Sequence, residues 1–169
     1  FPVIRPVLSP DALIDNLSRH YDLGEIITCH LLNQGINDVY TIESDKQKAI
    51  LRVGITEGRT PQQIQAEVEI HKYLLQNGIP VTSPIQRNDG TFVTEFDAPE
   101  GKRHSLVFEY VDCKFRGELT PQQGTVLGKT LAQIHTITDQ QPQPFARLRF
   151  DSTYFVDESL AMLEAFTPL

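Results

Sequence analysis

The sequence KAILRV at residues 48–53, followed by PQQIQAEVEIHKYLLQ at residues 61–76, decides the fold of this chain. The first run is rich in the aliphatic residues of a strand, and the second repeats apolar residues at helical spacing. One side of the predicted helix carries Ile64, Val68, Leu74 and Leu75. Glu67 falls inside that stripe, where a carboxylate is costly unless a cation meets it. We therefore expect Arg52 of the strand to pair with Glu67; the alternative is that Glu67 lies at a boundary and reaches solvent.

Three helices share one start signal, a hydroxyl residue followed by proline. A hydroxyl side chain can cap a helix, and proline fits the first helical position. The signal occurs at residues 9–10, 60–61 and 120–121. Gln63 and Gln123 complete a capping box at the last two. We expect helices over residues 10–21, 61–76 and 121–136, with a further amphipathic helix over residues 157–166.

The remaining regular structure is predicted to be an antiparallel sheet. Between the first two helices, β-rich runs at residues 25–32, 39–43 and 49–53 predict a three-strand meander. After the second helix, runs at residues 81–85, 91–96 and 105–111 predict two or three more strands, with a turn at 88–90 and a solvated loop at 97–102. About five strands, one packed helix and a leading helix make an α+β fold.

The character of the sequence changes near residue 112, where a loop-like stretch leads into helical and irregular segments. We therefore predict a domain at residues 1–111 and the start of a second, helical region at residues 112–169. The chain does not begin with Met and stops just after a helical pattern. We expect it to be a fragment of a longer protein.

Composition argues against several classes of partner. The 169 residues carry a net charge of −7, with a pI near 5.2, and no run of Lys or Arg is longer than Lys102-Arg103. We therefore expect neither nucleic acid nor an anionic membrane surface as a partner. No apolar stretch approaches the roughly 20 residues that span a bilayer, and the first residues do not resemble a signal peptide. The expected compartment is the cytoplasm, with Cys29 and Cys113 as reduced thiols.

Three polar features follow one another in chain order. A turn between the first two strands contains Gly35, Asn37 and Asp38, and its backbone amides could approach a phosphate. Arg52 follows in the third strand, and Glu67 faces inward from the next helix. The run LVFEYV at residues 106–111 then leads out of the sheet, as a hinge strand would.

This ordered set resembles the amino-terminal lobe of the aminoglycoside phosphotransferase and choline kinase superfamily, which are kinase-like small-molecule phosphotransferases. The resemblance covers roughly residues 23–137. The matching stretches are residues 34–40, 49–53, 67–81, 106–112 and 127–135. It implies a kinase-like nucleotide-binding lobe followed by the first helices of a truncated helical lobe.

The resemblance also implies roles for individual residues. Arg52 would touch the phosphates of ATP and Glu67 would orient it. Gly35, Asn37 and Asp38 lie in the turn that would close over those phosphates. At the hinge, the carbonyl of Glu109 and the amide of Val111 would bind adenine.

Two departures from the family pattern affect the expected activity. Arg52 stands where kinases more often have Lys, and a planar guanidinium reaches phosphate differently from an ammonium group. The catalytic loop, His-x-Asp followed by Asn, has no match after residue 111. His20-Tyr21-Asp22 has the first spacing only, and we interpret it as the end of the first helix. The catalytic base and the Mg²⁺ ligands are therefore expected outside this chain, which alone should be inactive.

Three functions stay open at this point. The first is the ATP-binding part of a phosphotransferase that moves the γ-phosphoryl of ATP to a hydroxyl of a small molecule, or of a protein serine or threonine. The second is a non-catalytic kinase-like module that binds a nucleotide or a protein. The third is an interaction domain that resembles a kinase lobe only in pattern. His71, beside Glu67, is interpreted as a packed, hydrogen-bonded histidine.

Overall fold

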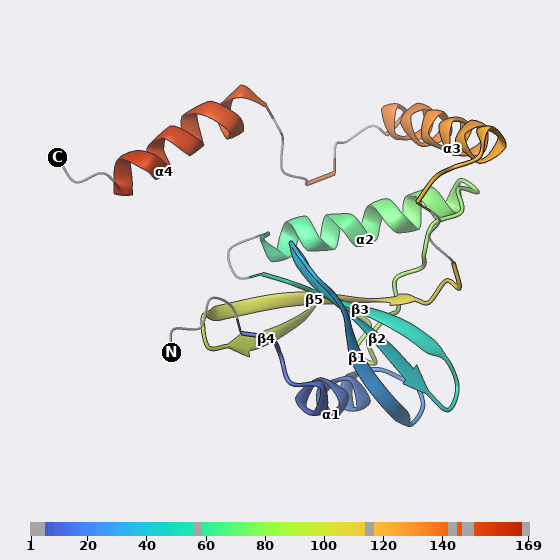
Figure 1. The fold of residues 1–169 in the computed structure, drawn as a ribbon, viewed down its shortest axis with the longest axis vertical. Helices are drawn as coiled ribbons and strands as arrows, with labels where there is room; N and C mark the ends of the chain where they lie inside the picture. The colour runs from blue at the N-terminus through green and yellow to red at the C-terminus, as the bar shows by residue number, and fades with distance from the viewer. Residues whose placement is uncertain (1–5, 56–58, 114–116, 142–144, 147–150, 167–169) are drawn as a thin grey trace.

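The structure is a computed structural model that describes residues 6–55, 59–113, 117–141, 145–146 and 151–166. Its core is one five-stranded antiparallel sheet with strand order β1-β2-β3-β5-β4. The elements are α1 (Pro10–His20), β1 (Ile26–Gln34), β2 (Asn37–Ser44), β3 (Lys48–Gly54), α2 (Pro61–Gln76), β4 (Thr94–Ala98), β5 (Gly101–Glu109), α3 (Pro121–Asp139), the π-helix η1 (Thr153–Glu158) and α4 (Ser159–Phe166). Figure 1 shows α1 on one side of the sheet and α2 on the other, with α3 and α4 on the α2 side. The predicted α+β fold is confirmed.

Side chains alternate between the two faces of the sheet, because successive strand residues point in opposite directions. The face toward α1 holds the larger core, with Leu13, Leu17, Tyr40, Ile42, Leu51, Val53 and Val107 among its buried members. The face toward α2 holds a smaller core of Ile64, Val68, Phe92, Leu106 and Phe108. The sheet therefore separates a mostly apolar layer from a layer in which Arg52 and Glu67 lie.

Two of the three predicted helix caps form. The side chain of Thr60 accepts a hydrogen bond from the Gln63 N–H, and the Gln63 side chain accepts one from the Thr60 N–H. Thr120 and Gln123 make the same box. The prediction for Ser9 is wrong in part, since its hydroxyl makes no cap bond although its carbonyl accepts from the Leu13 N–H at 3.0 Å. Proline at the first helical position starts α1 without the side-chain cap.

The segment at residues 81–85 is not a strand, contrary to prediction. It runs beside β5 and makes one isolated bridge, from Pro84 to Phe108. The Ile85 N–H donates to the Val107 carbonyl at 2.8 Å, and the Glu109 N–H donates to the Ser83 carbonyl at 2.9 Å. Pro84 has no N–H to donate, so the hydrogen bonds do not extend into a regular ladder.

Three smaller expectations also need correction. The predicted loop at residues 97–102 is mostly strand, because Ala98 and Gly101 pair across a tight turn. Leu75 is exposed, whereas Ile64, Val68 and Leu74 are buried as predicted. Helical structure near the carboxyl end begins at Thr153 rather than at residue 157.

The helix α3 contacts α2, although β4 and β5 lie between the two helices in the sequence. The Tyr73 hydroxyl of α2 donates to the Ile137 carbonyl of α3 at 3.0 Å. The apolar residues Val126, Leu127 and Leu131 of α3 are exposed. The division into residues 1–111 and 112–169 stays a prediction. Within the part of the chain that the structure describes, no helix is both long and apolar enough to cross a membrane.

Candidate functional site

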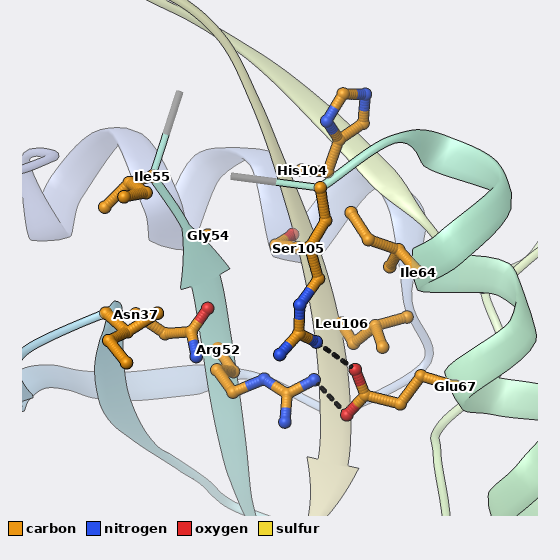
Figure 2. Close-up of a pocket in the computed structure, with 11 residues that line it drawn as sticks. Asn37, Arg52, Gly54, Ile55, Ile64, Glu67, His104, Ser105 and Leu106 are labelled. Atoms are coloured by element: carbon orange, nitrogen blue, oxygen red, sulfur yellow. Dashed lines mark hydrogen bonds and ion pairs between the residues drawn. The ribbon is translucent and has the colours of Figure 1, made fainter. Parts of the chain in front are cut away.

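Glu67 holds two arginines at the boundary between α2 and the sheet. Its Oε1 accepts a hydrogen bond from Nη2 of Arg52 in β3, so the predicted ion pair forms. Its Oε2 accepts a second bond, of 2.7 Å, from Nη1 of Arg59, which lies just before α2. Figure 2 shows Arg52 and Glu67 pointing toward one another from strand and helix. We call Arg52, Arg59 and Glu67 the open cluster.

The charges of the open cluster do not cancel. Two guanidinium groups face one carboxylate, and each guanidinium has five N–H donors. The Arg52 guanidinium also lies over the Phe108 ring, at 5.1 Å from its centroid. Because part of the Arg52 side chain reaches open space, the cluster presents positive charge and hydrogen-bond donors outward. An anion is the ligand that this arrangement favours.

Arg52 lines two cavities. The charged cavity, of about 50 Å³, also has Asn37, Gly54, Arg59 and Glu67 in its wall. The apolar cavity, of about 500 Å³, lies at the end of β5. Its wall includes Val39, Ile50, Phe108, Glu109 and Val111. A ligand in contact with Arg52 can therefore extend from a charged region into an apolar one.

The predicted hinge residues lie at the wall of the apolar cavity. Glu109 ends β5, and Val111 follows it two residues later in an exposed segment. Among the described residues, the Val111 N–H donates to no backbone carbonyl. Gly35, by contrast, lies in the β1–β2 turn, where its N–H donates to the Asn37 carbonyl at 3.1 Å. The walls of the two cavities thus include Asn37, Arg52, Glu67, Glu109 and Val111. Gly35 lies two residues before Asn37 and is hydrogen-bonded to it.

The structure corrects the expectation for Asp38. Its carboxylate is fully buried and accepts a hydrogen bond of 2.9 Å from Nη1 of Arg103. Asp38 shares its strand face with Tyr40 and Ile42, which pack on the α1 side. The side chain therefore points away from the open cluster, and a phosphate there would not meet it. We call Arg103 and Asp38 the sealed cluster.

Sequence reasoning missed Arg59 and Arg103, although each had a signal. Arg59 comes just before the cap of α2, where it can reach back to a carboxylate on the second turn. Arg103 is separated from Ser105 and Val107 by steps of two, so the strand period places it on the same buried face. The pattern was missed because Arg103 lies between the polar residues Lys102 and His104 in the sequence.

His71 lies in the wall of the apolar cavity and packs as predicted. Its ring is 5.1 Å from the ring of Phe108, and Nδ1 is 2.8 Å from the Thr82 carbonyl oxygen. Because a carbonyl only accepts hydrogen bonds, Nδ1 carries a proton in this contact.

The two cysteines differ sharply in environment. Cys29 is buried on the α1 face, and burial raises the pKa of its thiol to about 11. Cys113 is exposed and lines the apolar cavity. Both are free thiols, as predicted. Cys113 is therefore the more accessible nucleophile, because Cys29 is buried and its raised pKa disfavours the reactive thiolate.

No metal site is built by the described residues. Among them, no group of three or more His, Cys, Asp or Glu side chains lies close enough to hold a metal ion. The acidic residue of the open cluster, Glu67, is already bonded to two arginines. These residues do not by themselves fit a Mg²⁺ site.

Comparison with known sequences places these features in a family. A sequence profile of the phosphotransferase enzyme family matches residues 29–165. An uncharacterized protein of Synechocystis sp. is 35% identical over 98% of this chain and 46% of its own length. A homoserine kinase of Burkholderia thailandensis is 29% identical over 78% of this chain and 38% of its own length.

Solved structures agree on the fold. A microcompartment-associated aminopropanol kinase superimposes with a TM-score of 0.74 at 25% identity, over 88% of this chain and 47% of its own. An amicoumacin kinase, solved with AMP-PNP and Ca²⁺, gives a TM-score of 0.72 at 21% identity, over 95% of this chain and 48% of its own. The chain thus spans less than half the length of these relatives. The matches confirm the kinase-like fold and the resemblance found in the sequence, and the chain belongs to the phosphotransferase enzyme family.

Proposed function

We propose that this chain is the ATP-binding part of a phosphotransferase that moves the γ-phosphoryl group of ATP to a hydroxyl of a small molecule. The observation that carries the proposal is the position of Arg52, which lines both cavities while Glu67 holds its guanidinium. One ligand with an apolar ring and a chain of phosphates fits that layout.

The apolar cavity would take the adenine ring. Val39, Ile50 and Phe108 supply apolar surface around it. The Glu109 carbonyl would accept from the exocyclic amine of adenine, and the Val111 N–H, which has no backbone partner among the described residues, would donate to a ring nitrogen. Backbone groups fix the orientation of the base whatever the side chains are, which agrees with the exposed side chains at residues 109–111.

The open cluster would bind the phosphates. A guanidinium donates to phosphate oxygens through its planar fork. Arg52 would bind in this way while Glu67 limits its orientation, with Asn37 in the wall of the same cavity. ATP supplies the transferred group, and the contribution of these residues is positioning and charge neutralisation.

The acceptor is proposed from chemistry that two relatives share. One is named a homoserine kinase and another an aminopropanol kinase, and both compounds carry a free hydroxyl. A small-molecule hydroxyl is therefore the proposed acceptor class. Mg²⁺, a cytoplasmic location and the absence of a nucleic-acid partner stay predictions from the sequence, and the metal ligands are proposed to lie outside the described residues.

Nucleotide titration of the chain tests the role of Arg52. We expect a fluorescent ATP analogue to bind, and Arg52→Ala to weaken its binding about tenfold or more, since a charged hydrogen-bond donor is lost. Lys46→Ala is the matched control, because Lys46 lies in the β2–β3 turn and pairs with exposed Asp22. Equal affinity in the two variants would contradict the proposed phosphate site.

Alkylation of Cys113 tests the adenine site independently. Iodoacetamide should modify Cys113 faster than Cys29, and ATP should slow the modification of Cys113 alone. A Cys29→Ser background isolates the signal. In a longer protein that contains this chain, ATP turnover that Arg52→Ala abolishes supports the enzyme, whereas protection without turnover supports the non-catalytic module.

A further inference from the structure

The sealed cluster is more buried and makes more hydrogen bonds than a surface ion pair. Arg103 and Asp38 are 1% and 0% exposed, and they join β5 to β2 at 2.9 Å. Nε of Arg103 also donates to Glu100 Oε1 at 2.6 Å, in the β4–β5 turn. Nη2 donates to the Pro6 carbonyl at 2.9 Å, ahead of α1. Every nitrogen of this guanidinium is therefore bonded within the protein.

The sealed cluster lies beneath the end of the sheet that carries the charged cavity. The strand β3 runs between β2 and β5, so Arg103 reaches Asp38 across the α1 face of β3. Asp38 is opposite Val53, and the preceding residue Asn37 is opposite Gly54. Asn37 and Gly54 both line the charged cavity. The sealed carboxylate thus belongs to the residue directly after Asn37 of the cavity wall.

Because successive side chains of a strand point to opposite faces of the sheet, the orientation of Asp38 fixes that of Asn37. With Asp38 held on the α1 face, Asn37 must face the other side. A slip of β2 by one residue would exchange them. It would bury the Asn37 amide in the apolar layer and turn the Asp38 carboxylate toward the open cluster, where a negative charge would compete with phosphate for the arginines.

We propose that Arg103 and Asp38 form a positioning pair, which locks the register of β2 and so holds Asn37 and the β1–β2 turn over the charged cavity. The role rests on the proposed function, because it concerns the phosphate end of that site. It assigns Asp38 an indirect part in place of the direct contact expected from the sequence. Fixing register is the best-attested use of a buried ionic group.

The test separates the two ends of the nucleotide. A positioning role predicts weaker binding of AMP-PNP, which reaches the phosphate end, with unchanged binding of adenosine, which occupies only the apolar cavity. Two variants are compared, Asp38→Asn and the double variant Asp38→Asn/Arg103→Gln. The double variant replaces the ion pair with uncharged polar side chains, so that no charge is left buried without its partner and no new apolar residue holds the register of β2. Asp22→Asn, which removes an exposed ion pair with Lys46, is the control.

We expect both variants to bind AMP-PNP about tenfold more weakly, because misplacement on the ångström scale is enough to disrupt such contacts. Their affinity for adenosine, measured by competition with a fluorescent analogue, should match that of the unaltered chain and of the control. A folded double variant that keeps its AMP-PNP affinity, or that loses both ligands equally, overturns the positioning role. An unaltered chain that binds neither ligand overturns the proposed function, and the positioning role with it.

Discussion

The two faces of one sheet carry two arginine–carboxylate clusters that differ in their access to water. In the sealed cluster, Arg103 and Asp38 are 1% and 0% exposed, and in the open cluster Arg52 and Glu67 are 27% and 10% exposed. Arg103 and Asp38 are 65 positions apart in the sequence, whereas Arg52 and Glu67 are 15 positions apart. All three nitrogens of the Arg103 guanidinium donate hydrogen bonds within the protein, whereas Arg52 lies in the wall of two cavities. Access to solvent, rather than the presence of an ion pair, separates the candidate binding group from the internal one.

The sealed cluster should make the larger contribution to stability. Arg103→Met removes the guanidinium that is bonded to the buried Asp38 carboxylate, and removing one partner of such a pair lowers the free energy of unfolding by about 3–5 kcal/mol. Urea denaturation followed by circular dichroism measures the loss.

Arg59→Met is the matched comparison in the open cluster. Glu67 keeps Arg52, and Arg59 is more than a third exposed, so we expect a loss of at most about 1 kcal/mol. Similar losses in the two variants would show that the difference in burial has no energetic consequence.

Salt should distinguish the clusters by a smaller amount. Ions screen charges that water reaches, and the Debye length falls from about 10 Å at about 0.1 M to about 3 Å at about 1 M salt. The destabilisation caused by Arg52→Met should therefore shrink in about 1 M NaCl, by a few tenths of a kcal/mol. That caused by Arg103→Met should stay constant. The prediction fails if both differences respond to salt in the same way.

Alkaline pH probes how well the α1 face excludes water. Burial raises the pKa of Tyr21 above its ordinary value of 10.0, and a weaker opposing effect comes from its hydrogen bond with Thr94. The unfolded phenol ionises first as pH rises, so the folded state loses stability above about pH 10. Tyr21→Phe removes this contribution and should lose less stability between about pH 9 and about pH 11.

The expected difference between the chain and Tyr21→Phe is about 1 kcal/mol over that interval. Tyr40 and Cys29, whose pKa values burial also raises, titrate in both proteins and cancel in the comparison. Parallel curves for the two proteins would mean that the phenol of Tyr21 ionises as readily in the folded state as in the unfolded one.

Local patterns explain what the sequence could predict. The caps of α2 and α3 depend on residues three apart, and both formed as expected. The pair of Arg52 and Glu67 was predictable because one acid interrupts an apolar stripe next to a strand cation. The family resemblance then ordered these signals along the chain.

Long-range partners explain the rest. Asp38 and Arg103 are 65 positions apart. A local sequence pattern cannot predict that a residue of β2 and a residue of β5 will pair across the face of β3. Asp38 was therefore assigned to the cavity by its place in a polar turn. The strand prediction for residues 81–85 was wrong for another reason. The apolar composition of the segment suited a strand, but Pro84 has no N–H to donate to a ladder of hydrogen bonds.

The hydrogen bond between Tyr73 and Ile137 links the helix that carries Glu67 to α3. Glu67 and Tyr73 are six residues apart on α2, which is about 9 Å along a helix axis. A helix moves as a stiff rod over so short a length, because bending it would break its internal hydrogen bonds. The carboxylate that holds two guanidinium groups therefore shifts together with the point where α3 is attached. A displacement of α3 would therefore be transmitted to the charged cavity through α2.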